Sequence, residues 1–477
     1  MRNLVKEQIK KYEEKAIQLV DQMSLKEKVN LMSGTTSMMQ MGYDFMIKKH
    51  YNRNPYATGD NKRLGIPAMK FCDGPRGMVS GNGTCFPVSM GRGAAFDVEL
   101  EKKVGNAIGR EIRAMGGNFF GGVCINLPRN PGWGRSQESY GEESYHLGQM
   151  GAALTQGVQE HNVMACVKHY AFNSMENARF KVNVVCDKRT EREVYLPHFK
   201  DCIDAGAASV MTAYNKYLGV HCGHSEYLIR DVLKDEWDFD GFVISDFVWG
   251  IRDTAPAANG GMDIEMCNTK YFGSKLVKAV KKGEVEESII DEAAVRIVST
   301  ILAFTQAEDI QQYPQELIVC DEHIELAKTA AEKSMTLIKN ENGVLPFSKD
   351  VKKLAVIGRL AKEENLGDHG SSRVHPPYTV TPLDGLRKLL PDCEILYADG
   401  SDKSEAETAA KEAEAVIIFA GYDREDEGEY VSEKTDLGGD RKESLGLKKE
   451  EIKLINSVGC NNKNTAVVLI GGNMIML

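Results

Sequence analysis

The chain has 477 residues, of which 42% are hydrophobic and 27% are charged. This composition is typical of a globular protein and excludes a fibrous, collagen-like or disordered chain, while the length predicts about three domains or one large barrel with a smaller domain. With 59 basic and 69 acidic residues the net charge is -10, which argues against a nucleic-acid partner.

Neither a membrane segment nor a secretion signal is expected. No apolar run approaches the roughly 20 residues that a bilayer-spanning helix needs, and the first residues, MRNLVKEQIKKYEEK, are charged throughout. The eleven cysteines are scattered, odd in number and never form a Cys-x-x-Cys pair, as expected for free thiols in a reducing compartment. We therefore expect a cytoplasmic protein without a membrane partner.

Short apolar strands alternate with longer helices through residues 1–304. After helical periodicity from Leu4 to Met23, the strand candidates are Ile66–Phe71, Gly122–Leu127, Val163–Val167, Ala208–Ala213 and Phe242–Ser245. A helix over Glu287–Phe304 ends the region. Short buried strands separated by helices indicate a parallel α/β sheet, either a TIM-like (β/α) barrel or a doubly wound sheet. Periodicity alone does not choose between the two.

A second α/β domain is expected after a polar linker. The linker covers 305–322 and the domain 323–477, with strand candidates at Leu354–Ile357, Glu394–Tyr397, Ala415–Phe419 and Ala466–Ile470. The chain stops at GGNMIML, just after an apolar strand whose face needs a cover. We therefore expect this domain to be incomplete, so that the chain is a fragment or a partner, such as a second copy, supplies the remainder.

Polar side chains follow strand after strand in the first domain. They are Asp73, Arg135 and Glu138, Lys168 and His169, Tyr214 and Asn215, Asp246, and Asp263 with Glu265. One such residue would be an ordinary cap or turn former. Because parallel strands present their carboxyl ends at one edge, six such sites favour a shared pocket for a small, hydroxyl-rich or charged ligand.

No metal or organic cofactor is expected. His221, Cys222 and His224 lie close in sequence but lack the second ligand pair of a structural zinc site, so a loop with incidental polar residues is the better interpretation. The glycine-rich stretches fit neither a dinucleotide nor a P-loop spacing, which disfavours a nicotinamide-dependent oxidoreductase. Among the tryptophans, Trp237 is expected to pack, whereas Trp249 follows Asp246 closely and is a candidate for lining the pocket.

A series of longer segments surrounds these strand ends. They read LGIPAMKFCDGPRG, NLPRNPGWGRSQESYGEE, VKHYAFNSMENARFKVNV, RTEREVYLPHF, VMTAYNKYLG, DEWDFDGFVISDFVWG and GGMDIEM, then AVIG, DHGSSRV, TPLDGL and the DR of GGDRKESL. In this order they resemble glycoside hydrolase family 3, the β-glucosidase-like family, over nearly the whole chain. The resemblance implies a barrel followed by an α/β sandwich, an active site between them, and retaining hydrolysis of β-glycosides.

The resemblance also implies roles for single residues. Asp246 matches the nucleophile. Four residues match groups that hold the sugar hydroxyls, namely Asp73, Arg135, Lys168 and His169, and Met211 and Tyr214 match residues that line the same subsite. Phe247 departs from the tryptophan that many relatives carry, which leaves the aglycone preference open.

The second catalytic carboxyl group is expected in the acidic stretch DREDEGEYVSEKTDLGGDR, which follows an apolar strand. The family places its acid/base in a Glu-Gly step shortly before an Asp-Arg pair, and Glu427 precedes Gly428 here, with Asp440-Arg441 as the pair. The gap between them is longer than is usual in the family. The neighbouring acids stay open as alternatives, Glu429 first, then Glu425 and Glu433.

The leading hypothesis is a retaining, exo-acting β-glucosidase whose partners are small-molecule or oligosaccharide β-glycosides. A β-xylosidase or another exo-acting β-glycosidase is the alternative enzyme. A fragment that binds sugar without turnover is the alternative from a different class. A retaining glycosidase needs two carboxyl groups about 5–5.5 Å apart, one ionised and one protonated, and no metal.

Overall fold

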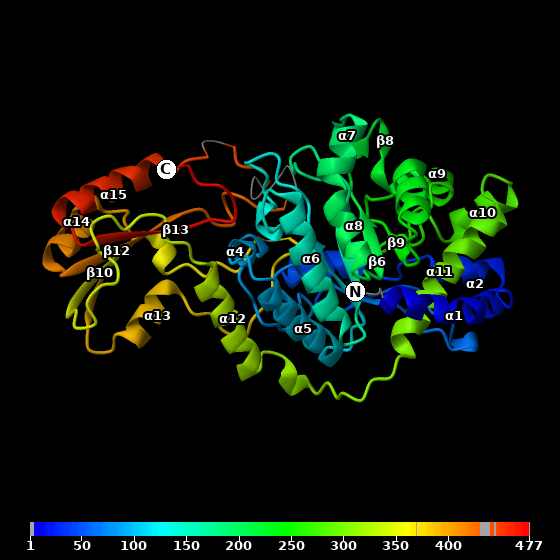
Figure 1. Cartoon of the computed structure of the whole chain (residues 1–477), viewed down its shortest axis with the longest axis horizontal. Helices are drawn as coiled ribbons and strands as arrows, with labels where there is room; N and C mark the ends of the chain where they lie inside the picture. Colours follow the sequence, from blue (N-terminus) through cyan, green and yellow to red (C-terminus); the bar gives the residue numbers. More distant parts are fainter. Residues whose placement is uncertain (1–3, 369, 430–438, 443–444, 477) are drawn as a thin grey trace.

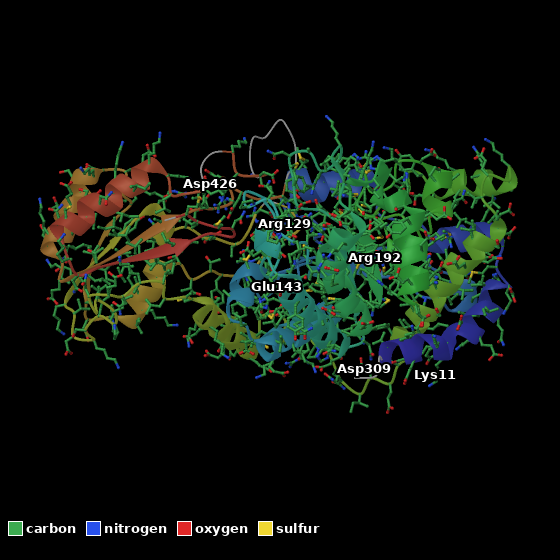
Figure 2. All side chains as sticks on the ribbon, turned by 45° about the horizontal axis from the view of Figure 1, so that its top comes forward. Lys11, Arg129, Glu143, Arg192, Asp309 and Asp426 are labelled. Atoms are coloured by element: carbon green, nitrogen blue, oxygen red, sulfur yellow. The ribbon has the colours of Figure 1, made fainter. Side chains whose placement is uncertain are left out.

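The computed structural model describes residues 4–368, 370–429, 439–442 and 445–476. Two domains lie side by side along the long axis of the molecule (Figure 1). The first runs from α1 (Leu4–Val20) to α11 (Glu287–Thr305), and the sheet of the second begins with β10 (Lys353–Ile357). Charged side chains such as Lys11, Arg129 and Glu143 cover the surface of the first domain (Figure 2).

The first domain is built on one sheet with the strand order β1-β2-β3-β4-β6-β9. These strands are β1 (Tyr56–Ala57), β2 (Lys70–Cys72), β3 (Phe119–Cys124), β4 (Met164–Tyr170), β6 (Ser209–Thr212) and β9 (Phe242–Ile244). Strands β2, β3, β4, β6 and β9 are parallel, and β1 is antiparallel to β2. Three isolated bridges lead from β9 back to β1, namely Ile244–Ile264, Ser33–Glu265 and Gly34–Thr58. The sheet therefore closes into a barrel, which decides against the doubly wound alternative.

Amphipathic helices surround this barrel. Besides α1 and α11 they include α5 (Val98–Ala114), α6 (Ser144–Gln159), α8 (Pro197–Asp204) and α10 (Ser274–Lys281). In α5, Asp97 caps the first turn by accepting a hydrogen bond from the Leu100 amide, and Val104, Ile108 and Ile112 form a fully buried stripe four residues apart. Each such side chain stabilises the fold by about 1.5–3 kcal/mol.

Shorter elements complete the first domain. They are α2 (Leu25–Leu31), α3 (Met38–Gly42), α4 (Ser89–Ala94), α7 (Lys188–Thr190), α9 (Thr254–Asn259), β5 (Asn183–Val184), β7 (Lys216–Tyr217) and β8 (Val220–His221). Residues 306–314, in the expected linker, have no regular structure. The next helix, α12 (Asp321–Ser334), packs against α4 and α5 of the barrel domain, ahead of the second sheet.

The second domain has a four-stranded parallel sheet with the order β11-β10-β12-β13. The strands that follow β10 are β11 (Glu394–Ala398), β12 (Ala415–Gly421) and β13 (Thr465–Ile470). Helices α14 (Lys403–Glu412) and α15 (Lys449–Asn461) lie on one side of the sheet and α13 (Pro382–Leu389) on the other (Figure 1). Separate buried clusters fill the two sides, one with Ala406 and Val458, the other with Leu354 and Leu383. The expected α/β sandwich is confirmed.

Across the described residues, none of the helices is both long and apolar enough to cross a membrane.

Candidate active site

A single pocket at the carboxyl ends of the barrel strands gathers the predicted site residues of the first domain. Its volume is about 240 Å³. Asp73 follows β2, Lys168 and His169 end β4, and Asp246 follows β9, so the parallel strands point these side chains at one edge. The predicted residues that line the pocket are Asp73, Arg135, Lys168, His169, Met211, Tyr214, Asp246 and Trp249.

The floor of the pocket is charged and buried. Lys168 Nζ donates to Asp73 Oδ1 at 2.7 Å, and Tyr51 Oη donates to Asp73 Oδ2 at 3.0 Å. Burial raises the pKa of Asp73 although the Lys168 ammonium opposes the rise. Burial and the cations Arg135 and Lys168 hold the pKa of His169 well below its usual range, so that its ring is neutral. The Lys168 ammonium and the Asp73 carboxylate can make charge-assisted hydrogen bonds to hydroxyl groups.

Arg135 is held in place by a two-point contact. Its Nε and Nη2 donate to the two carboxylate oxygens of Glu138 at 2.7 and 2.8 Å, and both side chains are buried. Nη2 also donates to the Ser371 hydroxyl of the second domain at 3.1 Å. The planar guanidinium is thereby fixed as a donor at the junction of the two domains.

The Asp246 side chain is buried, and one of its two carboxylate oxygens makes no hydrogen bond to the described residues. Its Oδ1 accepts a hydrogen bond from the Phe247 amide at 2.7 Å. Its Oδ2 is buried, has no hydrogen-bond partner among the described residues, and lies 3.8 Å from His169 Nε2. Burial raises the pKa of Asp246 to about 6, against the nearby cations Arg135 and Arg179. At neutral pH this carboxylate is ionised and one oxygen is available to attack.

Several residues beyond the predicted set also line the pocket, and three of them contribute polar groups beside Arg135 and Asp246. They are Arg179, Ser371 and Glu429, the last weighed only as a rival. Glu429 Oε1 accepts from Arg179 Nη1 at 2.9 Å, and its Oε2 accepts from the Ser371 amide at 2.8 Å. Burial alone would raise the pKa of Glu429, but the Arg135 and Arg179 guanidiniums hold it well below the usual range. Arg179 and Ser371 lie in two of the segments that carry the family resemblance, VKHYAFNSMENARFKVNV and DHGSSRV. These segments could have pointed to both residues as candidates for the site.

Glu427, the predicted acid/base, does not line the pocket. Its Oε2 accepts from Arg441 Nε at 2.7 Å and its Oε1 from the Gly472 amide at 2.8 Å, so both oxygens have partners within the second domain. Burial raises the pKa of Glu427 although Arg441 opposes the rise. The geometry therefore favours Glu429, two residues along the chain. Of the remaining alternatives, Glu425 is exposed, and Glu433 lies outside the described residues.

Asp440 connects the acidic loop to the barrel domain. Its carboxylate is buried and accepts hydrogen bonds from three backbone amides of the barrel domain, those of Gly134 at 3.1 Å, Glu176 at 2.9 Å and Asn177 at 3.2 Å. The Asp440 amide donates in return to Asn177 Oδ1 at 3.1 Å. This contact holds the loop that carries Glu429 against the chain beside Arg135.

Glu176 lies behind Arg179. Its Oε2 accepts from Arg179 Nη1 at 3.0 Å, and its Oε1 accepts from Trp133 Nε1 at 3.1 Å. Arg179 Nη1 thus bridges Glu176 and Glu429. Burial raises the pKa of Glu176 to about 7, against Arg179 and Arg135.

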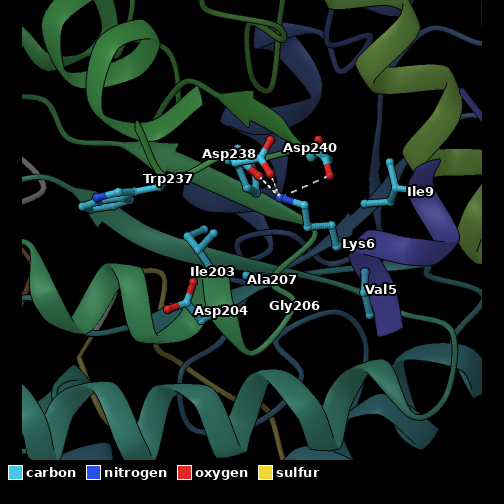
Figure 3. Close-up of a pocket in the computed structure, with 12 residues that line it drawn as sticks. Val5, Lys6, Ile9, Ile203, Asp204, Gly206, Ala207, Trp237, Asp238 and Asp240 are labelled. Carbon is cyan, nitrogen blue, oxygen red and sulfur yellow. Dashed lines mark hydrogen bonds and ion pairs between the residues drawn. The ribbon is translucent and has the colours of Figure 1, made fainter. Parts of the chain in front are cut away.

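A second cavity lies at the opposite end of the barrel (Figure 3). Residues 238–241 and Ala207 line it, just before β9 and β6 begin. Lys6 of α1 donates to Asp238 and lies 3.6 Å from Asp240, while Val5 and Ile9 pack beside it. Trp237 also lines this cavity and is 8% exposed, as expected for a packing role. Residues of α1 pack into this cavity, at the amino-terminal end of the barrel strands, where residues contribute to stability.

The His221–His224 loop and a second group of potential metal ligands do not line the pocket. His221 donates to the Tyr214 carbonyl at 3.3 Å and His224 Nε2 accepts from the Arg252 amide at 2.9 Å, so loop contacts occupy both rings. Among the described residues, Cys320, Glu322 and His323 have side-chain atoms within 4.8 Å of one another. Glu322 pairs with Arg110 at 2.8 Å and His323 with Glu111 at 2.9 Å.

Two family models match the chain. The glycosyl hydrolase family 3 N terminal domain matches residues 31–300, and the glycosyl hydrolase family 3 C-terminal domain matches residues 335–477. The chain belongs to glycosyl hydrolase family 3. The resemblance seen in the sequence is thereby confirmed.

Two curated relatives match most of this chain. The thermostable beta-glucosidase B of Acetivibrio thermocellus is 33% identical, over 96% of this chain and 60% of that protein. An exo-alpha-(1->6)-L-arabinopyranosidase of Bifidobacterium longum is 31% identical, over 86% of this chain and 56% of that protein. The chain thus spans about 60% of the length of the first of these.

Solved structures share the family 3 fold. The GH3 beta-glucosidase of Bifidobacterium adolescentis matches with a TM-score of 0.82 and 29% identity, over 96% of this chain and 64% of that one. The beta-D-glucoside glucohydrolase of Trichoderma reesei matches with a TM-score of 0.87 and 25% identity, over 98% of this chain and 67% of that one. Both matches extend across the barrel and the sandwich.

Proposed function

We propose that this chain is a retaining, exo-acting β-glucosidase that releases a terminal β-glucosyl unit. The observation that carries the proposal is the buried, charged pocket that Glu429 enters from the second domain and in which one oxygen of Asp246 has no hydrogen-bond partner among the described residues. The β-glucosidase names of the family 3 relatives support the choice of sugar. Because the chain spans only part of those relatives, its activity is tested on the chain itself.

In the proposed reaction Asp246 Oδ2 attacks the anomeric carbon while Glu429 gives a proton to the departing oxygen. The glycosyl-enzyme ester then reacts with water, which Glu429 deprotonates, and the configuration is retained. Asp73, Lys168 and His169 hold the sugar hydroxyls, and Met211 and Tyr214 support the ring. The reaction consumes water and needs neither metal nor organic cofactor.

The pairing with Arg179 sets a condition on Glu429. A carboxylate bound to two guanidinium groups is ionised at neutral pH and cannot donate a proton. A sugar that takes over the hydrogen bonds of Arg179 and excludes water would weaken this pairing and raise the pKa of Glu429. We therefore propose that substrate binding converts Glu429 into the acid.

A panel of chromogenic glycosides tests the proposal. The chain is incubated with 4-nitrophenyl β-D-glucoside, β-D-xyloside and α-L-arabinopyranoside, with Asp246→Asn as the matched control. We expect release of 4-nitrophenol to be fastest from the glucoside and absent with the control. Fastest release from the xyloside would support the β-xylosidase alternative, and sugar-induced thermal stabilisation without release would support the sugar-binding fragment.

We also propose a cytoplasmic location. All eleven cysteines are free thiols, and six of them are fully buried, with 0–1% of their surface exposed. Free thiols persist in a reducing compartment. Fractionation of cells followed by detection of the protein tests this, and recovery from the culture medium would contradict it.

A further inference from the structure

The active-site pocket has two chemically different parts. Its floor carries the buried charges of Asp73, Lys168 and Asp246. Another part of its lining is apolar and includes Met38, Met41, Phe45, Met46 and Trp249. A ligand that fits both parts has a hydroxyl-rich end and an apolar end.

We call the four residues Met38, Met41, Phe45 and Met46 the methionine wall. They belong to α3 and the helical segment that follows it, Tyr43–Ile47, which lie between α2 and β1. Met38 is 52% exposed and Met46 is 71% exposed. Single exposed apolar residues are ordinary, but a cluster of them at the rim of a pocket marks a binding surface.

Polar anchors hold this segment with its apolar side outward. Ser37 caps α3 by accepting from the Gln40 amide at 3.1 Å. Asp44 is only 1% exposed; its Oδ1 accepts from Gln40 Nε2 at 2.9 Å and its carbonyl accepts from the His50 amide at 2.9 Å. A helical turn that buries an aspartate and exposes Met46 is inverted relative to an ordinary surface helix. The inversion is explained if the methionines contact a ligand.

Trp249 adds a more rigid apolar surface to the pocket lining. Its ring lies 5.4 Å from the ring of Phe180, which in turn lies 4.9 Å from the ring of Tyr214. Trp249 is 44% exposed, so one part of the indole packs and another stays open. The pocket lining thus combines a rigid aromatic surface with flexible methionine side chains, a combination that adapts to apolar groups of different shape.

We propose that the methionine wall and Trp249 form the leaving-group subsite and that it binds an apolar alkyl or aryl aglycone in preference to a second sugar. The proposal rests on the proposed glycosidase function, because the charged floor must take the sugar for the aglycone to reach the wall. A second sugar would need hydrogen-bond partners along its hydroxyls, and thioether and indole side chains supply few.

A series of alkyl β-D-glucosides tests this with little change in leaving-group chemistry. The kcat/KM values for methyl, butyl and octyl β-D-glucoside are compared with that for cellobiose, below micelle-forming concentrations. Each methylene group that is transferred from water into an apolar subsite should raise kcat/KM about three- to fourfold. Burial of three methylene groups predicts an octyl-to-methyl ratio of about 30 to 60. The kcat/KM for cellobiose is expected to fall well below that for octyl glucoside.

Variants locate the effect. Met46→Gln and Met38→Gln are expected to reduce the octyl-to-methyl ratio by about fivefold or more, because a polar amide replaces the thioether. Met39→Gln is the matched control: Met39 is in the same helix and 85% exposed but does not line the pocket, so the wild-type ratio should persist. A ratio near one in the wild type, or an equal loss in all three variants, would overturn the proposal.

Binding of thioglycosides separates this proposal from the proposed function. Octyl and methyl 1-thio-β-D-glucoside resist hydrolysis, and their dissociation constants are measured by calorimetry. Turnover of glucosides without any octyl preference would overturn the methionine-wall proposal and leave the function standing. Absence of turnover would contradict the function, and the wall would then stand only if the octyl compound binds at least tenfold more tightly than the methyl one.

Discussion

Replacement of Asp440 by alanine should release the loop that carries Glu429 from the barrel domain that carries Asp246. The Asp440 carboxylate is 7% exposed and satisfies three backbone N–H groups of the barrel domain, those of Gly134, Glu176 and Asn177. A buried donor that loses its partner costs about 1–3 kcal/mol. The loss of all three partners therefore costs at least about 3 kcal/mol. Because 1.4 kcal/mol is a factor of ten, the equilibrium constant for docking of the loop on the barrel domain should fall roughly a hundredfold.

The assay combines thermal unfolding with kcat/KM for 4-nitrophenyl β-D-glucoside. Asp440→Ala should lower kcat/KM by about a hundredfold, because Glu429 is no longer held beside Arg135, and it should also lower the unfolding midpoint. Asp440→Asn keeps one acceptor oxygen, so its kcat/KM and unfolding midpoint should lie between those of the wild type and Asp440→Ala. Glu425→Ala, an exposed acid of the same loop, should stay near wild type. Wild-type activity and stability in Asp440→Ala would refute the reasoning.

Three further predictions concern the pocket itself. Glu429→Ala should slow the hydrolysis of substrates with poor leaving groups at least a hundredfold more than that of activated aryl glucosides. Added azide should restore turnover and give β-glucosyl azide. If azide restores turnover only in Glu427→Ala, the acid/base assignment returns to Glu427. Burial raises the pKa of Asp246 from 3.8 to about 6, so the nucleophile becomes protonated as the pH falls through 6 and the pH profile of kcat/KM should have its acid limb there; a limb near pH 4 would contradict this. Lys168→Met leaves the Asp73 carboxylate buried without its cation and should lower the free energy of unfolding by about 3–5 kcal/mol in denaturant titrations, whereas an unchanged midpoint would show that the pair is not needed.

The residues at strand ends could be predicted from the sequence because the argument is geometric. Parallel strands carry their carboxyl ends to one edge, so Asp73, Lys168 and Asp246 had to meet once the apolar runs before them were recognised as strands. Closure of the barrel could not be predicted in the same way. The closing pairs Ser33–Glu265 and Gly34–Thr58 are isolated bridges without an apolar run to announce them.

The choice between Glu427 and Glu429 shows where sequence reasoning stops. Both lie in a loop without helical or strand periodicity, so spacing does not tell which carboxylate faces the pocket. The decision depends on partners distant in sequence: Arg441 pairs with Glu427, and Arg179 of the barrel domain pairs with Glu429. The methionine wall could not be predicted for a related reason, since only the fold brings α3 to the pocket that Asp246 also lines.

Covalent trapping tests the central claim that Asp246 is the nucleophile of a retaining β-glucosidase. The chain is treated with 2,4-dinitrophenyl 2-deoxy-2-fluoro-β-D-glucoside, digested, and its peptides are sequenced by mass spectrometry. We predict one 2-deoxy-2-fluoroglucosyl group per chain, attached to Asp246 and absent when Asp246→Asn is treated in the same way. Attachment to Asp263 or Glu265, or no attachment in a chain that hydrolyses β-glucosides, would contradict the account.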